Sequence, residues 1–327
     1  MVVSIGFVGS GGIARTHMDS LQKIPDAKIV AFCDVDLNRA KAAASSFQGA
    51  RAYKDVSEMV KMEKLDGIYV CVPPFAHGFE LQLIEKGIHL FIEKPIALTM
   101  EVAKEIDTAI AKAGVINSVG YMWRYLDTTD IALKALKENG PIGMVMGQYH
   151  DPYWFPPDHW WIDKSKGGGQ VIEQSTHVFD LARYIAGDVS RVYAELDTLL
   201  LKDVKGFNVE DVSVVSLRFK DGAVGVVTST CASRNTFTGT ALKFLAKNVA
   251  AELGGHAGNV KLYWTDRIEE LRSKVNPYHE EDKTFIEAVK TGNVTKIKSQ
   301  YNDALKTLEV TILANRSSRE KRPFSPS

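Results

Sequence analysis

Two short stretches of the 327-residue chain carry side chains that could transfer protons. In the first, the strand-like residues 89–92, of which the last three are apolar, run directly into Glu93, Lys94 and Pro95. If residues 89–92 form a strand of a parallel sheet, Lys94 stands at its carboxyl end, where such sheets bind ligands. The alternative is a strand that ends in solvated charges, since most charged side chains are exposed.

The second stretch follows three consecutive glycines at 167–169 and is expected to form one helix. Glu173, His177 and Asp180 occupy positions i, i+4 and i+7, so they share a face of that helix. Apolar residues on the opposite side can pack on a sheet; they are Val178, Leu181 and Ile185. A stripe of carboxylates and imidazole behind a glycine loop suits acid/base catalysis. The alternative is the ordinary polar face of an amphipathic helix.

A dinucleotide-binding pattern stands at the start of the chain. The strand-like residues 2–8 are followed by the frame G-x-G-x-x-A, which ends at Ala14 and opens a helix. The first glycine permits a tight turn, the second lets a pyrophosphate approach the backbone, and the small third residue lets helix and strand pack. Phosphate then lies at the helix N-terminus. The expected cofactor contacts in this loop are Gly9, Gly11, Gly12 and Ile13.

An acidic residue stands at the spacing that this pattern requires. Asp34 ends the strand-like residues 28–33, 20 residues after Ala14, where a carboxylate accepts hydrogen bonds from an adenosine ribose. Its negative charge would repel a 2′-phosphate, which favours NAD over NADP, whereas the nearby Arg39 keeps NADP as the alternative. A helix-capping role for Asp34 is the competing interpretation.

Apolar strands and helices continue to alternate up to residue 119, which predicts a parallel, doubly wound Rossmann sheet. Val72 and Pro73 end another strand at the same edge as the glycine loop, so we expect them to contact the cofactor. His77 follows near a helix start, where a cofactor contact and a histidine without ligand are equally compatible with the sequence.

The pattern of expected elements changes after residue 120. Strands predominate at 142–150, 189–201, 212–219, 223–230 and 240–245, at short spacing and with few helices. This pattern predicts an α+β domain with a large, mostly antiparallel, open sheet. We therefore expect a dinucleotide-binding domain at 1–120 and a substrate-binding and oligomerisation domain at 121–327. The exposed face of the sheet would be covered in a homodimer or homotetramer.

An aromatic segment in this second half could contact a substrate. Trp154, Trp160 and Trp161 lie close together in the sequence, followed by Asp163. Aromatic faces can stack on sugar rings or cyclic alcohols, and large aromatics can equally anchor a long loop to the body of the domain. We expect these four residues, together with Asp180, to bind the substrate.

Composition excludes several classes of protein. Forty basic and forty acidic residues cancel, so the chain has no overall field to attract nucleic acid or an anionic membrane. It has no apolar run long enough to span a membrane and no signal-peptide pattern. Three scattered cysteines give neither a disulfide framework nor a metal site. We expect a cytoplasmic protein without a metal ion.

Taken together, the glycine turn, Asp34, the Glu93-Lys94-Pro95 motif and the glycine-led helix with His177 resemble the glucose–fructose oxidoreductase / inositol dehydrogenase (Gfo/Idh/MocA) family over the whole chain. The resemblance implies that Lys94 lies by the nicotinamide before a cis-proline peptide, and that Lys94 and His177 handle the proton. It also implies that Arg124 lies near cofactor and substrate. Glu173 stands where the family often has an aspartate, and Glu93 is expected among the cofactor contacts.

The resulting expectation is an NAD(P)-dependent dehydrogenase acting on a secondary alcohol of a sugar, an inositol or a related polyol. General acid/base assistance of this kind is typically worth about 10²–10⁴-fold. Two alternatives remain open at this point. One is an NAD-dependent glycoside hydrolase or lyase that uses transient oxidation, and the other is a non-catalytic dinucleotide sensor.

Overall fold

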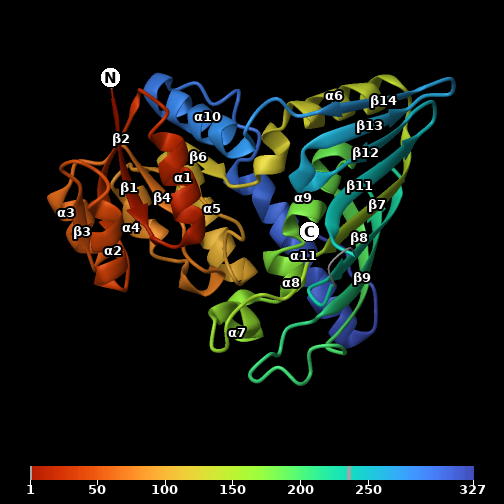
Figure 1. Ribbon diagram of the computed structural model, residues 1–327, viewed down its shortest axis with the longest axis horizontal. Coiled ribbons are helices and arrows are strands. Elements are labelled where there is room, and N and C mark those ends of the chain that lie inside the picture. The colour runs from red at the N-terminus through yellow and green to blue at the C-terminus, as the bar shows by residue number, and fades with distance from the viewer. Residues whose placement is uncertain (1, 234–236) are drawn as a thin grey trace. The chain divides into compact units, whose positions relative to one another are not determined.

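The computed structural model describes residues 2–233 and 237–327, which form two compact units (Figure 1). The first unit holds the residues up to Met122 together with Asn276–Leu305, and the second holds Trp123–Val275 and Lys306–Ser327. The expected division at residue 120 did not include the later segment Asn276–Leu305 in the first unit. Helix α10 (Pro277–Thr291) belongs to the first unit because its apolar side chains join the core of that unit. No helix among the described residues has the length and apolar composition needed to cross a membrane.

The first unit is built on a six-stranded sheet whose strands are all parallel, as predicted. In spatial order the strands are β3 (Arg51–Tyr53), β2 (Ala27–Cys33), β1 (Val3–Val8), β4 (Gly67–Val70), β5 (His89–Ile92) and β6 (Asn117–Val119). The helices of this part are α1 (Gly12–Leu21), α2 (Leu37–Ala44), α3 (Val56–Met62), α4 (Glu80–Glu85) and α5 (Met100–Ala113). The strand order reverses between β1 and β4, and that switch point is where a doubly wound sheet leaves a ligand crevice.

Aromatic side chains fill the core of this unit. Tyr69 stacks on Phe91 with ring centroids 4.6 Å apart and on Phe7 at 5.1 Å. Phe285 of α10 meets Tyr69 and Phe91 edge-on, at 5.6 and 5.7 Å. These contacts explain why α10 packs beside α1 and β1 although about 260 residues separate them in the chain.

The second unit is built on an eight-stranded sheet in the order β14-β13-β12-β11-β7-β10-β9-β8. The predicted strands are present as β7 (Ile142–His150), β8 (Val189–Asp197), β9 (Val212–Phe219), β10 (Val224–Thr230) and β11 (Gly239–Ala246). Three further strands extend the sheet: β12 (Ala250–Leu253), β13 (Asn259–Tyr263) and β14 (Ile268–Arg272). Among the described strand pairs of this sheet, β7 and β10 are parallel and the others are antiparallel, so the sheet is mostly antiparallel, as expected. The unit also contains α6 (Asp127–Glu138), and α11 (Tyr301–Glu320) continues into it.

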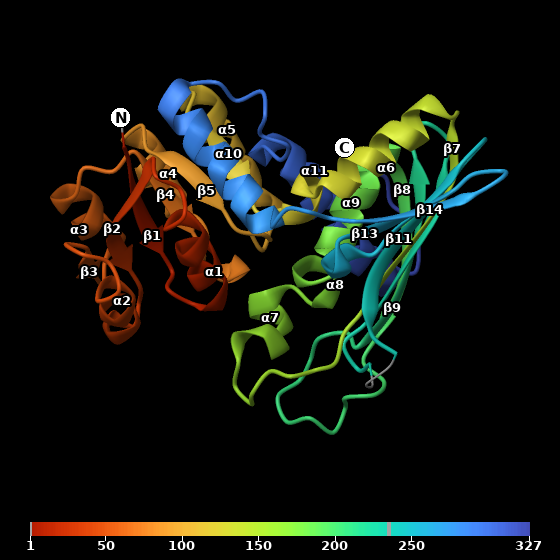
Figure 2. The same cartoon turned by 45° about the horizontal axis from the view of Figure 1, so that its top comes forward.

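The helix expected to carry Glu173, His177 and Asp180 is in fact two helices, so that prediction is wrong. α8 (Gln170–Glu173) ends at Glu173, and α9 (Thr176–Ala186) begins three residues later. Between them, the Ser175 hydroxyl lies 2.7 Å from the Ser229 hydroxyl of β10, and such side-chain bonds compete with helix continuation. Both helices lie on one face of the sheet (Figure 2).

The apolar side of α9 packs as predicted. Val178, Leu181 and Ile185 are buried. A Cβ on Gly147 of β7 would lie 2.5 Å from Val178, so the glycine lets the helix approach the sheet closely. This packing fixes the polar side of α9, which carries His177 and Asp180.

Candidate active site

The glycine loop after β1 has the shape that a dinucleotide requires. Gly9 has φ +91°, and a Cβ there would lie 2.2 Å from the carbonyl oxygen of Cys71, so only glycine fits. At Gly11 and Gly12 a Cβ would meet nothing within 4 Å, so the space over the loop is open. α1 starts at Gly12 without a side-chain cap, which leaves the N-terminal amides available to a pyrophosphate. Ile13 lies in the same first turn.

Asp34 lies at the carboxyl end of β2, beside this loop. Its Oδ2 accepts a hydrogen bond from the Ser10 amide at 2.9 Å, and its Oδ1 accepts one from the Asp36 amide at 2.9 Å. The exposed Arg39 brings its guanidinium to 3.2 Å from Oδ1. A buried carboxylate at this edge suits the hydroxyls of an adenosine ribose, and Arg39 stands where a 2′-phosphate would need a partner.

Lys94 follows β5 at the same edge of the sheet. Its side chain is half-buried, and the Lys94–Pro95 peptide bond is cis, as the family resemblance implied. The Lys94 amide donates to Oε2 of the buried Glu93 at 3.0 Å. Val72 and Pro73 follow the neighbouring strand β4, so the parallel register brings both strand ends to one edge.

His77 lies beyond Pro73 and is held by a carboxylate. Its Nδ1 lies 2.5 Å from Oε1 of Glu80, whose Oε2 accepts a hydrogen bond from the Gly78 amide at 2.7 Å. Both side chains are buried, and Nε2 of His77 has no hydrogen-bond partner among the described residues. Glu80 thus fixes the imidazole, and a cofactor contact through Nε2 stays a prediction.

In the second unit, Asp180 and Arg124 form a buried, bidentate ion pair. Arg124 donates from Nε to Oδ2 at 2.7 Å and from a terminal nitrogen to Oδ1 at 2.5 Å. The Thr307 hydroxyl donates to Oδ1 at 3.0 Å, and the Arg124 guanidinium lies 4.7 Å from the centre of the Tyr184 ring. Asp180 is therefore committed to holding Arg124, and the predicted contacts of the pair with substrate and cofactor remain predictions.

His177 lies one turn before Asp180 and is also buried, at 6% exposure. Its ring lies 5.1 Å from that of Trp123. The ring of His256, an exposed residue, also meets the Trp123 indole edge-on, at 5.0 Å. Sequence patterns did not single out Trp123 or His256, because 133 residues separate them and neither lies in a motif.

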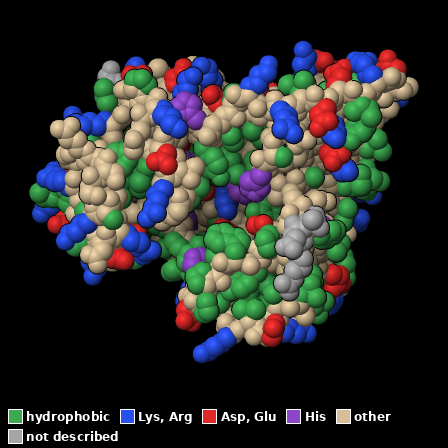
Figure 3. All heavy atoms as spheres, in the orientation of Figure 1, with side chains coloured by type: hydrophobic (Ala, Val, Ile, Leu, Met, Phe, Trp, Pro, Cys, Tyr) green, Lys and Arg blue, Asp and Glu red, His purple; other side chains and the backbone are tan. Residues whose placement is uncertain are grey.

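The aromatic segment mostly packs against its own loop. Trp161 is buried in a small cluster, where it stacks on Phe155 at 4.5 Å, and its indole N–H donates to Glu173 at 2.6 Å. Trp160 packs against the same cluster, which matches the loop-anchoring alternative. Trp154 is 66% exposed. Hydrophobic side chains gather on the surface over α7 (Lys164–Gly167) and the adjoining loops (Figure 3).

Two capping carboxylates shape this region. Asp163 caps α7 by accepting hydrogen bonds from the amide and hydroxyl of Ser165, which lower the pKa of the Asp163 carboxyl. Glu210 was not anticipated from the sequence. It accepts from the Val171 amide at 3.0 Å at the start of α8, and a Cβ on Gly169 would lie 2.4 Å from it. The absence of a side chain at Gly169 therefore leaves room for the buried Glu210 carboxylate. Substrate contacts by Asp163, Trp160 and Trp161 stay predictions.

Comparison with known proteins agrees with these features. Residues 3–121 match the model of an oxidoreductase family with an NAD-binding Rossmann fold, and residues 132–261 match the GFO/IDH/MocA C-terminal domain. A myo-inositol 2-dehydrogenase from Thermotoga maritima is 30% identical over 335 residues, covering 97% of this chain and 97% of that protein.

Two solved structures share the fold over the whole chain. The WlbA dehydrogenase from Bordetella pertussis, in complex with NADH and UDP-GlcNAcA, is 23% identical with a TM-score of 0.86, covering 100% of this chain and 99% of that one. Levoglucosan dehydrogenase, in complex with NADH and levoglucosan, is 20% identical with a TM-score of 0.89, covering 100% of both chains. The glycine loop, Asp34 and Lys94 thus belong to an NAD-binding Rossmann domain.

Proposed function

Because the chain belongs to the GFO/IDH/MocA oxidoreductase family, we propose that it oxidises a secondary alcohol of a sugar, an inositol or a related polyol with NAD⁺. One relative, matched over 97% of both chains, is a myo-inositol 2-dehydrogenase, and a structural neighbour is solved in complex with levoglucosan, an anhydrosugar. Myo-inositol and levoglucosan are both ring compounds with several secondary hydroxyl groups.

One observation carries this proposal. A half-buried lysine and an open glycine loop lie along one sheet edge of a single unit, at the carboxyl ends of β5 and β1. A dinucleotide held by the loop at the β1/β4 switch point would extend along the edge that carries Lys94. The alternative, a strand that ends in solvated charges, does not account for the uncapped helix α1 and the buried Asp34 at the same edge.

The residues divide the chemistry as follows. Bound NAD⁺ supplies the hydride acceptor. Amides after Gly11 and Gly12 would bind its pyrophosphate, and Asp34 would accept from its adenosine ribose. As the alcohol carbon loses its hydride, the hydroxyl loses a proton, and the products are a ketone and NADH. Lys94 hydrogen-bonds the hydroxyl oxygen, and His177 takes up the proton, because an imidazole ordinarily titrates near neutral pH.

We also propose a cytoplasmic homodimer or homotetramer. All three cysteines are free and buried, which suits a reducing compartment. On the outer face of the second sheet, Met144, Val224 and Leu245 are register neighbours and each is at least 39% exposed. An apolar patch of this kind on neighbouring strands favours a protein partner. Sedimentation showing only monomer at micromolar concentration would refute the oligomer.

The experiment for the function is a substrate panel. Inositols, aldoses, anhydrosugars and glycosides are incubated with NAD⁺ or with NADP⁺; reduced nicotinamide is followed by its absorbance, and released sugar by chromatography. We expect net reduction with NAD⁺ and at least one cyclic polyol. Sugar release from a glycoside without net reduction would instead identify the hydrolase or lyase alternative. Tight dinucleotide binding without turnover of any compound would identify a sensor.

A further inference from the structure

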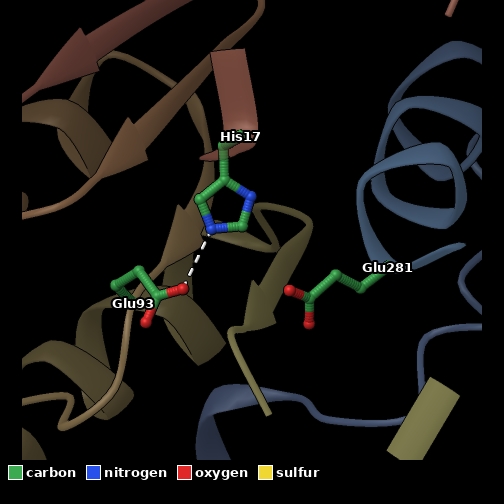
Figure 4. A group of neighbouring side chains, drawn as sticks. All are labelled: His17, Glu93 and Glu281. Atoms are coloured by element: carbon green, nitrogen blue, oxygen red, sulfur yellow. Dashed lines mark hydrogen bonds and ion pairs between the residues drawn. The ribbon is translucent and has the colours of Figure 1, made fainter. Parts of the chain in front are cut away.

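A buried network of ionisable side chains lies behind the strand end that carries Lys94. His17 of α1 is fully buried. Its Nε2 lies 2.9 Å from Oε1 of Glu93, and its Nδ1 lies 2.8 Å from Oδ1 of Asp282 on α10. Figure 4 shows His17 bonded to Glu93, with the carboxyl group of Glu281 pointing toward both. The network therefore joins two helices to the end of β5.

Aromatic rings hold the imidazole in place. The His17 ring meets Phe91 edge-on at 4.8 Å and Tyr278 edge-on at 5.9 Å, and Tyr69 lies 5.3 Å away. A ring surrounded in this way cannot rotate without displacing the core. Its two nitrogens therefore present fixed hydrogen-bond directions to the two carboxylates.

Each nitrogen of the imidazole lies at hydrogen-bond distance from a carboxylate oxygen, an arrangement that favours the protonated ring. Burial lowers the pKa of His17, but the neighbouring carboxylates of Asp282 and Glu93 outweigh it and raise that pKa well above 6.5. Ligand atoms of His17, Glu93 and Glu281 lie within 4.8 Å of one another, a spacing that a metal ion could also use. Both nitrogens of His17 already lie at hydrogen-bond distance from a carboxylate oxygen, so the geometry is that of a hydrogen-bonded chain.

Glu93 is the link between this chain and Lys94. One of its oxygens accepts from His17, and the other accepts from the Lys94 amide at 3.0 Å. On the His17 side, a Cβ on Gly120 would lie 2.6 Å from Oε1, so the backbone at Gly120 closes against the carboxylate. The carboxylate therefore has one permitted position, and the main chain at Lys94 is bonded to it.

We propose that His17 and Asp282 are positioning residues for Lys94. Asp282 orients the imidazole of His17, the imidazole fixes the carboxylate of Glu93, and that carboxylate fixes the main chain from which the Lys94 side chain extends. The inference rests on the proposed function of Lys94. Loss of a residue that positions a catalytic group through hydrogen bonds typically lowers activity by about 10–100-fold.

Two substitutions of His17 separate positioning from stability. The amide of Gln reaches about as far as Nε2 and can still donate to Glu93, whereas that of Asn reaches only as far as Nδ1 and serves Asp282 alone. Both remove the same charge, so both should lower the melting temperature similarly. We expect His17→Asn to lower kcat at least tenfold more than His17→Gln, with the Kd for NAD⁺ unchanged. Equal kcat in the two variants would overturn the inference.

A second variant covers the case in which both His17 variants fail to fold. Gly120→Ala pushes on Oε1 of the Glu93 carboxylate, the same oxygen that accepts from His17. Its matched control is Asp66→Asn, which weakens a carboxylate bond to the Ser4 amide at the amino ends of β1 and β4. We expect a tenfold or greater loss of kcat for Gly120→Ala only. Unchanged kcat in Gly120→Ala would contradict the inference.

A readout without turnover distinguishes this inference from the proposed function. Lysines are converted to ¹³C-dimethyl-lysine, and the Lys94 signal is assigned with Lys94→Arg. We expect His17→Asn to shift that signal and His17→Gln to leave it near its wild-type position. An unshifted signal in His17→Asn would overturn the positioning role. A wild-type protein that reduces no NAD⁺ with any polyol would overturn the proposed function alone.

Discussion

The two units each contain a buried ionic cluster next to a predicted catalytic residue, and the clusters differ in kind. In the first unit, the imidazole of His17 lies between Glu93, which precedes Lys94, and Asp282. In the second, the guanidinium of Arg124 pairs with Asp180, one turn after His177. The first cation can lose its charge at accessible pH, whereas a guanidinium cannot.

The number of carboxylates differs as well. Arg124 and Asp180 balance one another in a forked pair that Thr307 completes. The first cluster holds three carboxyl groups around one imidazole, and burial raises the pKa of Glu281 well above its ordinary value. We therefore expect the Arg124–Asp180 pair, called the brace below, to keep its charges as the pH changes. The charges of the first cluster should change with pH. Each cluster lies next to a residue that we propose to handle the proton, Lys94 or His177, so the contrast is open to test.

The largest effect is expected at the residue that the first cluster positions. Lys94→Ala removes the group assigned to the hydroxyl oxygen, so kcat should fall by about 10²–10⁴-fold. The glycine loop and Asp34 are untouched, so the Kd for NAD⁺ should change little. Steady-state kinetics with the best polyol and a calorimetric titration with NAD⁺ measure the two quantities.

A matched control for that experiment is Lys104→Ala, on the exposed side of α5. It removes the same side chain from the same unit and should keep wild-type kcat. Turnover by Lys94→Ala at the wild-type rate would remove Lys94 from the mechanism. The comparison of the two clusters would then concern stability alone.

The next effect concerns the brace of the second unit. Asp180→Asn removes the carboxylate that pairs with the buried guanidinium of Arg124, and breaking a buried ion pair typically costs about 3–5 kcal/mol. Asp266→Asn removes an exposed partner of the exposed Arg267 and should cost about 0–1 kcal/mol. Urea unfolding of both variants measures the difference in the free energy of unfolding. Equal losses would mean that the Arg124 pair is not the fixed brace inferred from its geometry.

The smallest effect is a pH dependence confined to the first cluster. Burial raises the pKa of Glu281 above 4.5, so the folded state holds a proton that the unfolded chain releases as the pH rises past 4.5. Stability from this group is thus present at low pH and declines as the pH rises toward the folded pKa. Glu281→Gln cannot titrate, so its free energy of unfolding should fall less between pH 5 and 8, a window near the ordinary carboxyl and imidazole values. A variant with the wild-type slope would show that Glu281 does not titrate.

The matched control is Glu287→Gln on the exposed side of the same helix, α10. It removes an equal charge from a solvated position and should keep the wild-type slope. His17 should supply the decline that remains in Glu281→Gln, because its own pKa is also raised and its contribution is lost as the pH rises through that value.

The sequence predicted the first unit well for a physical reason. Its elements are local: each strand is a continuous apolar run, and the glycine loop with Asp34 lies within 26 residues. The edge that carries Lys94 then follows from parallel pairing. α10 could not be assigned to this unit from its local pattern, because its role depends on Phe285 packing against rings more than 190 residues earlier.

The failures in the second unit and in the first cluster share a cause. Residues 170–180 have helical spacing, but a bond from Ser175 to Ser229, 54 residues away, accompanies the break between Glu173 and His177. His17 lies in an ordinary helical position, and its two partners are 76 and 265 residues away. Single-sequence patterns report local periodicity, and they contain no signal for such distant hydrogen bonds.

The central claim is that the protein moves hydride from a polyol carbon to NAD⁺. It is tested most directly with the best substrate of the panel, deuterated at its ring CH–OH carbons, and unlabelled NAD⁺. We predict one deuterium in the reduced nicotinamide, detected by mass spectrometry, and its appearance at a rate about 10²–10⁴-fold lower with Lys94→Ala. Product formation with no deuterium in the nicotinamide would contradict the account.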